Sequence, residues 1–252
     1  MAFTRALQLC LAITFASQAV KAVDCSSSTF SSLTLSTIEI LSFNVTALYN
    51  TTVSSGGSAS GTGVGIVSAS TGDVPSTVDL CQIAIEYTHP GQYDTVNTWI
   101  GLPLEADSWN NRFLMNGGGG WTAGEEDVIL TPVAAGYSSS STDGGHNSSV
   151  TTAEWGLVSE GNINWPALND FASVALDDAA NLGLMASEIY YGTKPTWSYW
   201  NGCSTGGRQG HMMAQRYPEH FDGILAGCSA FNWERFQSSS MLPDVLATRL
   251  GT

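Results

Sequence analysis

The chain has 252 residues, of which 43% are hydrophobic and 12% are charged, which is enough for one large domain or two small ones with a sizeable core. Its formal net charge is −14 and its pI is near 4.3. This acidic balance is typical of a secreted protein. It argues against a nucleic-acid partner, because phosphates bind lysine and arginine.

The N-terminus has the pattern of a secretory signal peptide. Arg5 supplies a positive charge, an apolar run follows over residues 6–16, and small residues come after it. We expect cleavage near Ala19 or Ala22, so that residues 1–22 form the signal peptide. Neither this run nor any later one is long enough to span a membrane. The sequence therefore predicts an extracellular protein with no membrane partner.

The mature chain, residues 23–252, is predicted to form one domain that contains disulfides. Its four cysteines are Cys25, Cys81, Cys203 and Cys228. In an oxidising compartment they are expected to pair, and three connectivities are open. No C-x-x-C motif and no Cys/His cluster with zinc spacing is present, so we predict no metal site.

The first half of the mature chain is rich in predicted strands. Residues 33–48 alternate between apolar and polar, and residues 81–87 and 95–104 are predicted to form a hairpin. His89 lies in the turn of that hairpin and is interpreted as a turn histidine.

The chain has three N-x-S/T sequons, at Asn44, Asn50 and Asn147, and export would make them accessible to glycosylation. Each is expected at the surface as a glycosylation site, with an unused sequon as the alternative.

A short buried strand over 112–116 leads directly into a run of four glycines, 117–120. Glycine lets a backbone N–H face a ligand without a Cβ in the way. In α/β-hydrolases a glycine-rich loop after the third strand supplies one oxyanion donor, so Gly118 and Gly119 are candidates. The alternative is a plain flexible loop.

A further strand is predicted over 133–142, followed by His146. That histidine either lines a cleft at the edge of the sheet or bonds within its own loop. The clearest predicted helix covers 167–191, with apolar residues at intervals of three and four. Asn169 or Asp170 is expected to cap it, and Gly192 to end it.

Residues 197–210 carry the strongest functional signal. Four aromatic or small residues suit a strand, Gly202–Gly206 fits G-x-S-x-G, and a helical pattern follows. This order is typical of a nucleophile elbow, which exposes a serine hydroxyl on a strained turn. We expect Ser204 to be the nucleophile and the Thr205 N–H to be an oxyanion donor. The alternative is a glycine-rich turn with a capping serine.

Strands alternate with helices over residues 112–227, which indicates a mostly parallel sheet. With the antiparallel segment before it, this predicts an α/β fold of the α/β-hydrolase type. The fold is expected to be incomplete, because the triad acid and histidine follow the serine in later strands.

Several stretches resemble the fungal tannase and feruloyl esterase family. They are Asp79–Ile83, Trp109–Gly124, Ser141–His146, Tyr190–Gly192, Gly202–Gly210 and Ala214–Gly227, within residues 25–236. The cysteine directly before the serine is the most specific feature. The resemblance implies a secreted serine esterase whose substrates are phenolic-acid esters, such as those of ferulate or gallate.

The same resemblance assigns Cys203 to a disulfide with a cysteine beside the catalytic histidine. That cysteine, the histidine, the acid and a lid with a calcium site would lie beyond Thr252, so we assign no cofactor to this chain. Cys203 is then left without that partner, as a free thiol or paired with Cys228. Cys25 and Cys81 are expected to form an early disulfide. Asp177 departs from the family pattern, which often has histidine there.

Two function classes remain open. The first is a serine esterase, inactive as the 252-residue chain. The second is a non-catalytic secreted protein that binds polyphenols or glycans, for which eight tryptophans and eight tyrosines provide stacking surfaces.

Overall fold

The computed structural model describes residues 24–53, 76–146 and 151–250. The expected signal peptide and the Asn147 sequon lie outside these ranges. In chain order, the elements are β1 (Glu39–Thr52), β2 (Thr77–Thr88), β3 (Val96–Pro103), η1 (Ala106–Ser108), β4 (Arg112–Asn116), η2 (Glu126–Ile129), α2 (Leu130–Ala134), β5 (Ser139–Thr142), α3 (Thr152–Gly156), β6 (Leu157–Ser159), β7 (Asn162–Ile163), α4 (Trp165–Ala172), α5 (Val174–Tyr191), β8 (Trp197–Cys203), α6 (Thr205–Arg216), β9 (Gly223–Gly227) and α7 (Trp233–Leu250). Within these ranges, no helix has the length and apolar character needed to cross a membrane.

The N-terminal strands form an antiparallel sheet in the order β1-β2-β3-β5. The predicted hairpin is confirmed, because β2 pairs with β3 from Leu80 opposite Pro103 to Tyr87 opposite Val96. Asn44 and Asn50 both lie exposed on β1, which is the surface position that a sequon needs.

The strand predicted over 133–142 is wrong in its first half. Val133 and Ala134 end the short helix α2, and only Ser139–Thr142 is a strand. Gly136 lies between them with a φ of 84°, a left-handed conformation that ends the helix.

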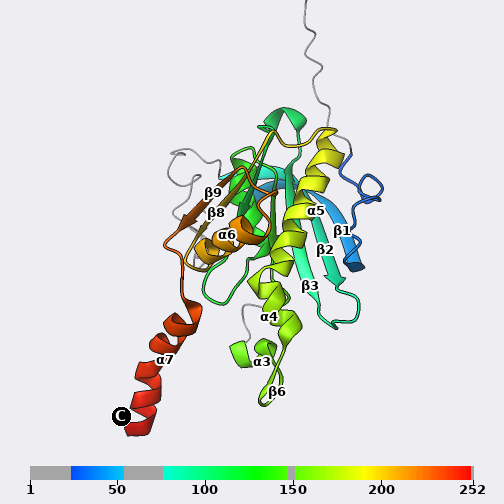
Figure 1. Ribbon diagram of the computed structural model, residues 1–252. Coiled ribbons are helices and arrows are strands. Elements are labelled where there is room, and N and C mark those ends of the chain that lie inside the picture. The colour runs from blue at the N-terminus through cyan, green and yellow to red at the C-terminus, as the bar shows by residue number, and fades with distance from the viewer. Residues whose placement is uncertain (1–23, 54–75, 147–150, 251–252) are drawn as a thin grey trace, which may run out of the picture.

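The second sheet is parallel, in the order β4-β8-β9. An isolated parallel bridge between Phe113 and Ser138 joins β4 to the residue before β5, and so connects the two sheets. Figure 1 shows α5 running along β2 and β3, while α6 lies beside β8 and β9. This arrangement brings the carboxyl ends of β4, β5 and β8 to one edge, where α/β folds place their sites.

The predicted helix over 167–191 is in fact two helices, α4 and α5, which meet at Ser173. The side chain of Arg208 donates to the carbonyls of Phe171 (3.1 Å) and Ala172 (2.8 Å). It thereby satisfies the last carbonyls of α4, which the break leaves without helical partners. The N-terminal cap predicted at Asn169 or Asp170 was also wrong, because Asn164 caps α4 by accepting from the Ala167 N–H. Gly192 ends α5 as predicted, with a left-handed φ of 69°.

The main core lies between the antiparallel sheet and α5. Its buried side chains include Ile83, Ile85, Ile100, Leu182 and Tyr190. A second cluster fills the space between the parallel sheet, α5 and α6, around Trp200. Helix α7 extends away from both (Figure 1). The parallel sheet and its core therefore hold the end of β8 rigidly.

Candidate active site

Ser204 occupies a strained turn between β8 and α6. Its φ is 57° and its ψ is −117°, a conformation that non-glycine residues rarely adopt. The residue is exposed, and α6 starts at the next position. The structure therefore has the strand, turn and helix that the G-x-S-x-G motif predicted.

Close backbone contacts surround Gly202 and Gly206, the glycines two positions before and after Ser204. A Cβ on Gly202 would lie 2.5 Å from the backbone of Gly206, and a Cβ on Gly206 would lie 3.1 Å from the Gly118 carbonyl oxygen. Below Gly206, the Trp200 indole N–H donates to the Gly206 carbonyl at 3.0 Å. The tight turn thus depends on two absent side chains and one buried ring.

The glycine run 117–120 lies directly against this elbow. The Gly206 N–H donates to the Gly118 carbonyl at 2.9 Å, and the Thr205 hydroxyl donates to the Gly120 carbonyl at 2.5 Å. The Gly117 N–H donates to the Asn201 carbonyl, also at 2.9 Å. The two glycine-rich segments are therefore one hydrogen-bonded unit.

The expected set of oxyanion donors needs one correction. The Gly118 N–H already donates to the Gln209 Oε1 at 2.9 Å, so it is not available to a ligand. Gln209 is fully buried and also donates to the Ala123 carbonyl. Gly119 and Thr205 remain as candidates. Sequence reasoning missed Gln209, whose only signal is a polar residue on the inner face of α6.

None of the four histidines hydrogen-bonds Ser204 in the part of the chain that the structure describes. Each has another contact. His89 bonds to Asp94 and Asp178, and the His146 Nε2 lies 2.5 Å from the Trp121 carbonyl oxygen. The His220 Nε2 lies 2.5 Å from the Asp177 Oδ1, and the His211 ring centroid lies 4.7 Å from that of Phe231. His146 bonds both its own loop and the loop after the glycine run. These residues give Ser204 no base.

The structure shows how the four cysteines of the mature chain pair. Cys25 and Cys81 are bonded, as predicted. Cys203 is bonded to Cys228. Of the two outcomes that the sequence left open for Cys203, a free thiol or a bond to Cys228, the structure has the bond. The bond is possible because β8 and β9 are parallel neighbours that end side by side at Cys203 and Gly227.

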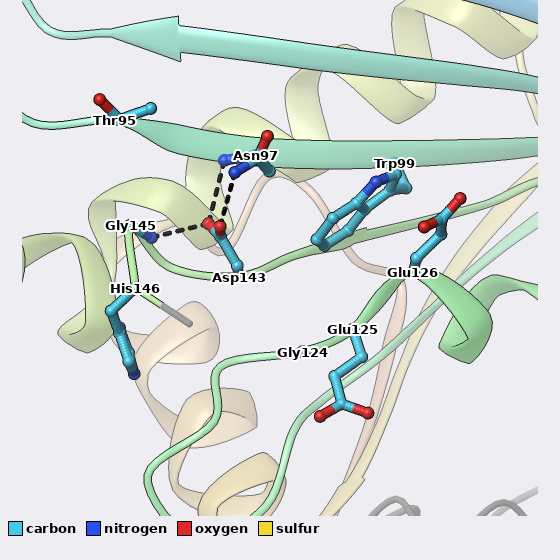
Figure 2. Close-up of a pocket in the computed structure, with 9 residues that line it drawn as sticks. All are labelled: Thr95, Asn97, Trp99, Gly124, Glu125, Glu126, Asp143, Gly145 and His146. Carbon is cyan, nitrogen blue, oxygen red and sulfur yellow. Dashed lines mark hydrogen bonds between the residues drawn. The ribbon is translucent and has the colours of Figure 1, made fainter. Parts of the chain in front are cut away.

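A pocket of about 440 Å³ lies between the start of β3, the segment that follows β5 and the loop of residues 124–126 (Figure 2). It is lined by Thr95, Asn97, Trp99, Gly124, Glu125, Glu126, Asp143, Gly145 and His146. Asp143 accepts hydrogen bonds from Asn97 and Gly145, as the dashed lines show. Burial raises the pKa of Asp143. The lining is polar and acidic around one tryptophan.

The structure also contains a buried ionic cluster that the sequence did not indicate. His89 was interpreted as a turn histidine, but it is buried and contacts Asp94 and Asp178. Asp170 lies beside it, with its Oδ1 3.7 Å from the His89 Nδ1. Hydrogen bonding to Asp178 raises the pKa of His89 to about 9, and burial raises the pKa of Asp170 to about 7. This group could hold a metal ion.

The sequence profile of the family "Tannase and feruloyl esterase" matches residues 81–244. A probable feruloyl esterase from Arthroderma benhamiae is 42% identical over 176 residues, which are 68% of this chain and 32% of that protein. A tannase from Aspergillus oryzae is 31% identical over 165 residues, which are 64% of this chain and 28% of that protein.

Solved structures give the same result. The tannin acyl hydrolase from Aspergillus niger superposes with a TM-score of 0.72 at 27% identity, covering 90% of this chain and 40% of that chain. An esterase from Aspergillus oryzae superposes with a TM-score of 0.61 at 25% identity, covering 84% and 38%. This chain thus spans about a third of the length of the curated relatives above. It has an α/β-hydrolase-type fold and belongs to the tannase and feruloyl esterase family.

Proposed function

We propose that this chain carries the nucleophile of a secreted serine carboxylic ester hydrolase that cleaves phenolic-acid esters. The observation that supports this most directly is Ser204, an exposed hydroxyl on a strained turn at the start of α6. Such a position lets a serine approach a base and an ester carbonyl at once. The family relatives named above are esterases and tannases.

In the proposed reaction, the Ser204 Oγ attacks the ester carbonyl and loses its proton to a base. The oxyanion that forms accepts hydrogen bonds from the N–H groups of Thr205 and Gly119. Thr205 is the first residue of α6, so its N–H has no partner within the helix, and the helix dipole adds positive potential there. The alcohol leaves, and water then hydrolyses the acyl-serine.

The base and its orienting acid are proposed to come from outside the 252 residues. A base must approach within about 3 Å of the serine oxygen, directly or through one water. All four histidines of the chain are described and have other contacts, as given above. The isolated chain is therefore expected to be a poor esterase.

An aromatic cluster next to the glycine run supports the phenolic substrate. Trp121 follows Gly120 and is 36% exposed. Its ring packs on Trp155, Phe171 and Trp233. Aromatic rings stack well on one another at such distances. A feruloyl or galloyl ring whose carbonyl sits at Ser204 could stack on the open face of Trp121.

The test uses a fluorophosphonate probe on the secreted protein purified from culture medium. We expect the probe to label Ser204. The variant Ser204→Ala should lose all labelling and all hydrolysis of methyl ferulate or methyl gallate. The control Ser32→Ala, which alters an exposed serine, should keep the labelling and the hydrolysis unchanged. Labelling at another serine would contradict the proposal. Binding of gallate esters without hydrolysis would favour the non-catalytic alternative. Residues 23–252 expressed alone should show at most a tenth of the turnover of that secreted protein.

A further inference from the structure

Four ionisable side chains from three separate segments meet in the interior. His89 and Asp94 belong to the connection between β2 and β3, Asp170 to α4, and Asp178 to α5. None of the four side chains is more than 5% exposed. Three carboxylates around one imidazole leave an excess of negative charge, which is costly to bury without a compensating cation.

The imidazole is held in a fixed orientation. The His89 Nε2 lies 2.9 Å from the Asp178 Oδ2, and that oxygen also accepts from the Tyr87 hydroxyl at 3.3 Å. The His89 Nδ1 faces Asp94 and lies 3.7 Å from the Asp170 Oδ1. Thus one nitrogen is anchored by a carboxylate, and the other points at two more.

Asp170 gives a second, independent observation that points to a ligand. It is 0% exposed, and neither of its carboxylate oxygens has a hydrogen-bond partner among the described residues. Buried carboxylates are almost always paired, because the cost of leaving one unpaired is large. Its Oδ1 is turned toward the His89 Nδ1 and Asp94, so the missing partner belongs between these three groups.

We propose that His89, Asp94 and Asp170 bind a divalent transition-metal ion, Zn²⁺ or Mn²⁺, with Asp178 holding the His89 ring in place. One ligand atom from each of the three residues lies within 4.8 Å of the others. One imidazole nitrogen with carboxylate oxygens is a donor set that Zn²⁺ and Mn²⁺ accept. Metal-bound histidines commonly donate their other N–H to a carboxylate, which is the contact that Asp178 makes.

Binding is a proton exchange that balances the charge. The ion replaces the proton on the His89 Nδ1, and that proton leaves to solvent, while the Nε2–H bond to Asp178 stays. The imidazole becomes a neutral ligand, and the two positive charges of the ion face the carboxylates of Asp94 and Asp170. Asp170 thereby gains the partner that it lacks.

The pocket in Figure 2 lies close to this interior site. Thr95 and Gly145 line the pocket, and they adjoin Asp94 and Asp170. A Cβ on Gly145 would lie 3.4 Å from the Asp170 Oδ2 and 3.4 Å from a Val96 methyl group, so Gly145 lines the pocket and also lies near the carboxylate. The site joins the β2–β3 connection to α4 and α5, and its role is to fix these elements rather than to react.

Metal analysis of the whole secreted protein, expressed with added Zn²⁺, tests the proposal without any assay of activity. We expect about one equivalent of zinc, removed by a strong chelator. At a free Zn²⁺ concentration of about 100 Kd, the melting temperature of the stripped protein should rise by about 5–10 °C. Mn²⁺ added to stripped protein should give a bound-ion electron paramagnetic resonance signal.

Variants locate the ion. Asp170→Asn keeps the shape of the side chain but removes a charged ligand, and should weaken Zn²⁺ binding at least 100-fold. Asp178→Asn acts through the His89 ring and should weaken it about 10–100-fold. The matched control Asp177→Asn alters the other His–Asp pair, that of His220, and should bind Zn²⁺ like the unchanged protein.

Substoichiometric zinc in the unchanged protein, with no thermal shift, would overturn the proposal. The cluster would then hold protons only. Equal zinc binding by Asp170→Asn and the unchanged protein would likewise overturn the assignment, even if zinc were found.

Discussion

The elbow and the buried ionic cluster are two rigid regions of this chain built in opposite ways. The elbow consists of residues close together in the chain, and its backbone contacts are so close that a Cβ on Gly202 would lie 2.5 Å from the Gly206 backbone. The cluster consists of side chains from residues 89, 94, 170 and 178, and it is held by charge. The elbow is specified by glycines within one short stretch of sequence. The cluster is specified by polar side chains that are far apart in the sequence and meet only in the fold. Different perturbations should therefore damage each.

The largest effect is expected from Asp178→Ala. This change removes the acceptor of both the His89 Nε2 and the Tyr87 hydroxyl, and leaves buried polar groups unpaired. Breaking a buried pair from one side costs about 3–5 kcal/mol. Urea unfolding in the presence of chelator should show this loss, with the exposed Asp107→Ala as a control near zero. A loss below about 1 kcal/mol would mean that the cluster contributes little to the fold.

The next effect concerns the disulfide beside the elbow. Replacing both Cys203 and Cys228 with alanine removes a link across 25 residues, worth about 3–4 kcal/mol on chain-entropy grounds. The segment after Cys228 also holds Ser204, since the Ala230 N–H donates to the Ser204 carbonyl at 3.2 Å. The double variant should therefore lose stability and label more slowly with the fluorophosphonate probe.

Removing the other disulfide, Cys25–Cys81, is the matched control. Its sequence separation is 56, so the expected stability loss is slightly larger, about 4 kcal/mol, yet the labelling rate of the folded protein should not change. Equal labelling rates in both double variants would show that the Cys203–Cys228 bond does not position Ser204. Peptide mapping without reductant would establish the pairing itself.

A smaller loss is expected from Gly202→Ala. The added methyl group would lie 2.5 Å from the Gly206 backbone, which cannot move without disturbing the turn. Overpacking of this kind costs about 1–3 kcal/mol. Gly156→Ala is the control, because an added Cβ there meets no atom within 4 Å and its φ is not positive. Thermal unfolding of the two variants should differ by several degrees, and equal melting temperatures would refute the crowding argument.

The same contrast explains how much the sequence could predict. The elbow, the strand Arg112–Asn116 and the β2–β3 hairpin depend on local spacing and turn residues, and these were predicted from the sequence. The cluster depends on where α4 and α5 pack, which no local pattern encodes. In the sequence, Asp178 is only a polar residue among the apolar positions of the helix predicted over 167–191. The break at Ser173 was missed because the group that stabilises it, Arg208, is 35 residues further along.

The Gly118 correction has the same cause. A glycine run after a buried strand predicted backbone donors near Ser204, but not which N–H would already be taken. The Gly118 N–H is taken because it donates to Gln209, whose side chain extends from the buried face of α6. Gly118 and Gln209 are 91 positions apart in the sequence, so their hydrogen bond depends on the complete fold and not on a local pattern.

The hydrogen bonds between the glycine run and the elbow also set an order of folding events. Residues 117–120 bond to partners 85 to 91 positions later in the chain, at Thr205, Gly206 and Gln209. Contacts of such long range form slowly, because the chain between them must first be ordered. During synthesis the antiparallel sheet can form well before the elbow residues emerge. We therefore expect Ser204 to reach its strained, exposed conformation late in folding, after the surrounding sheet has formed.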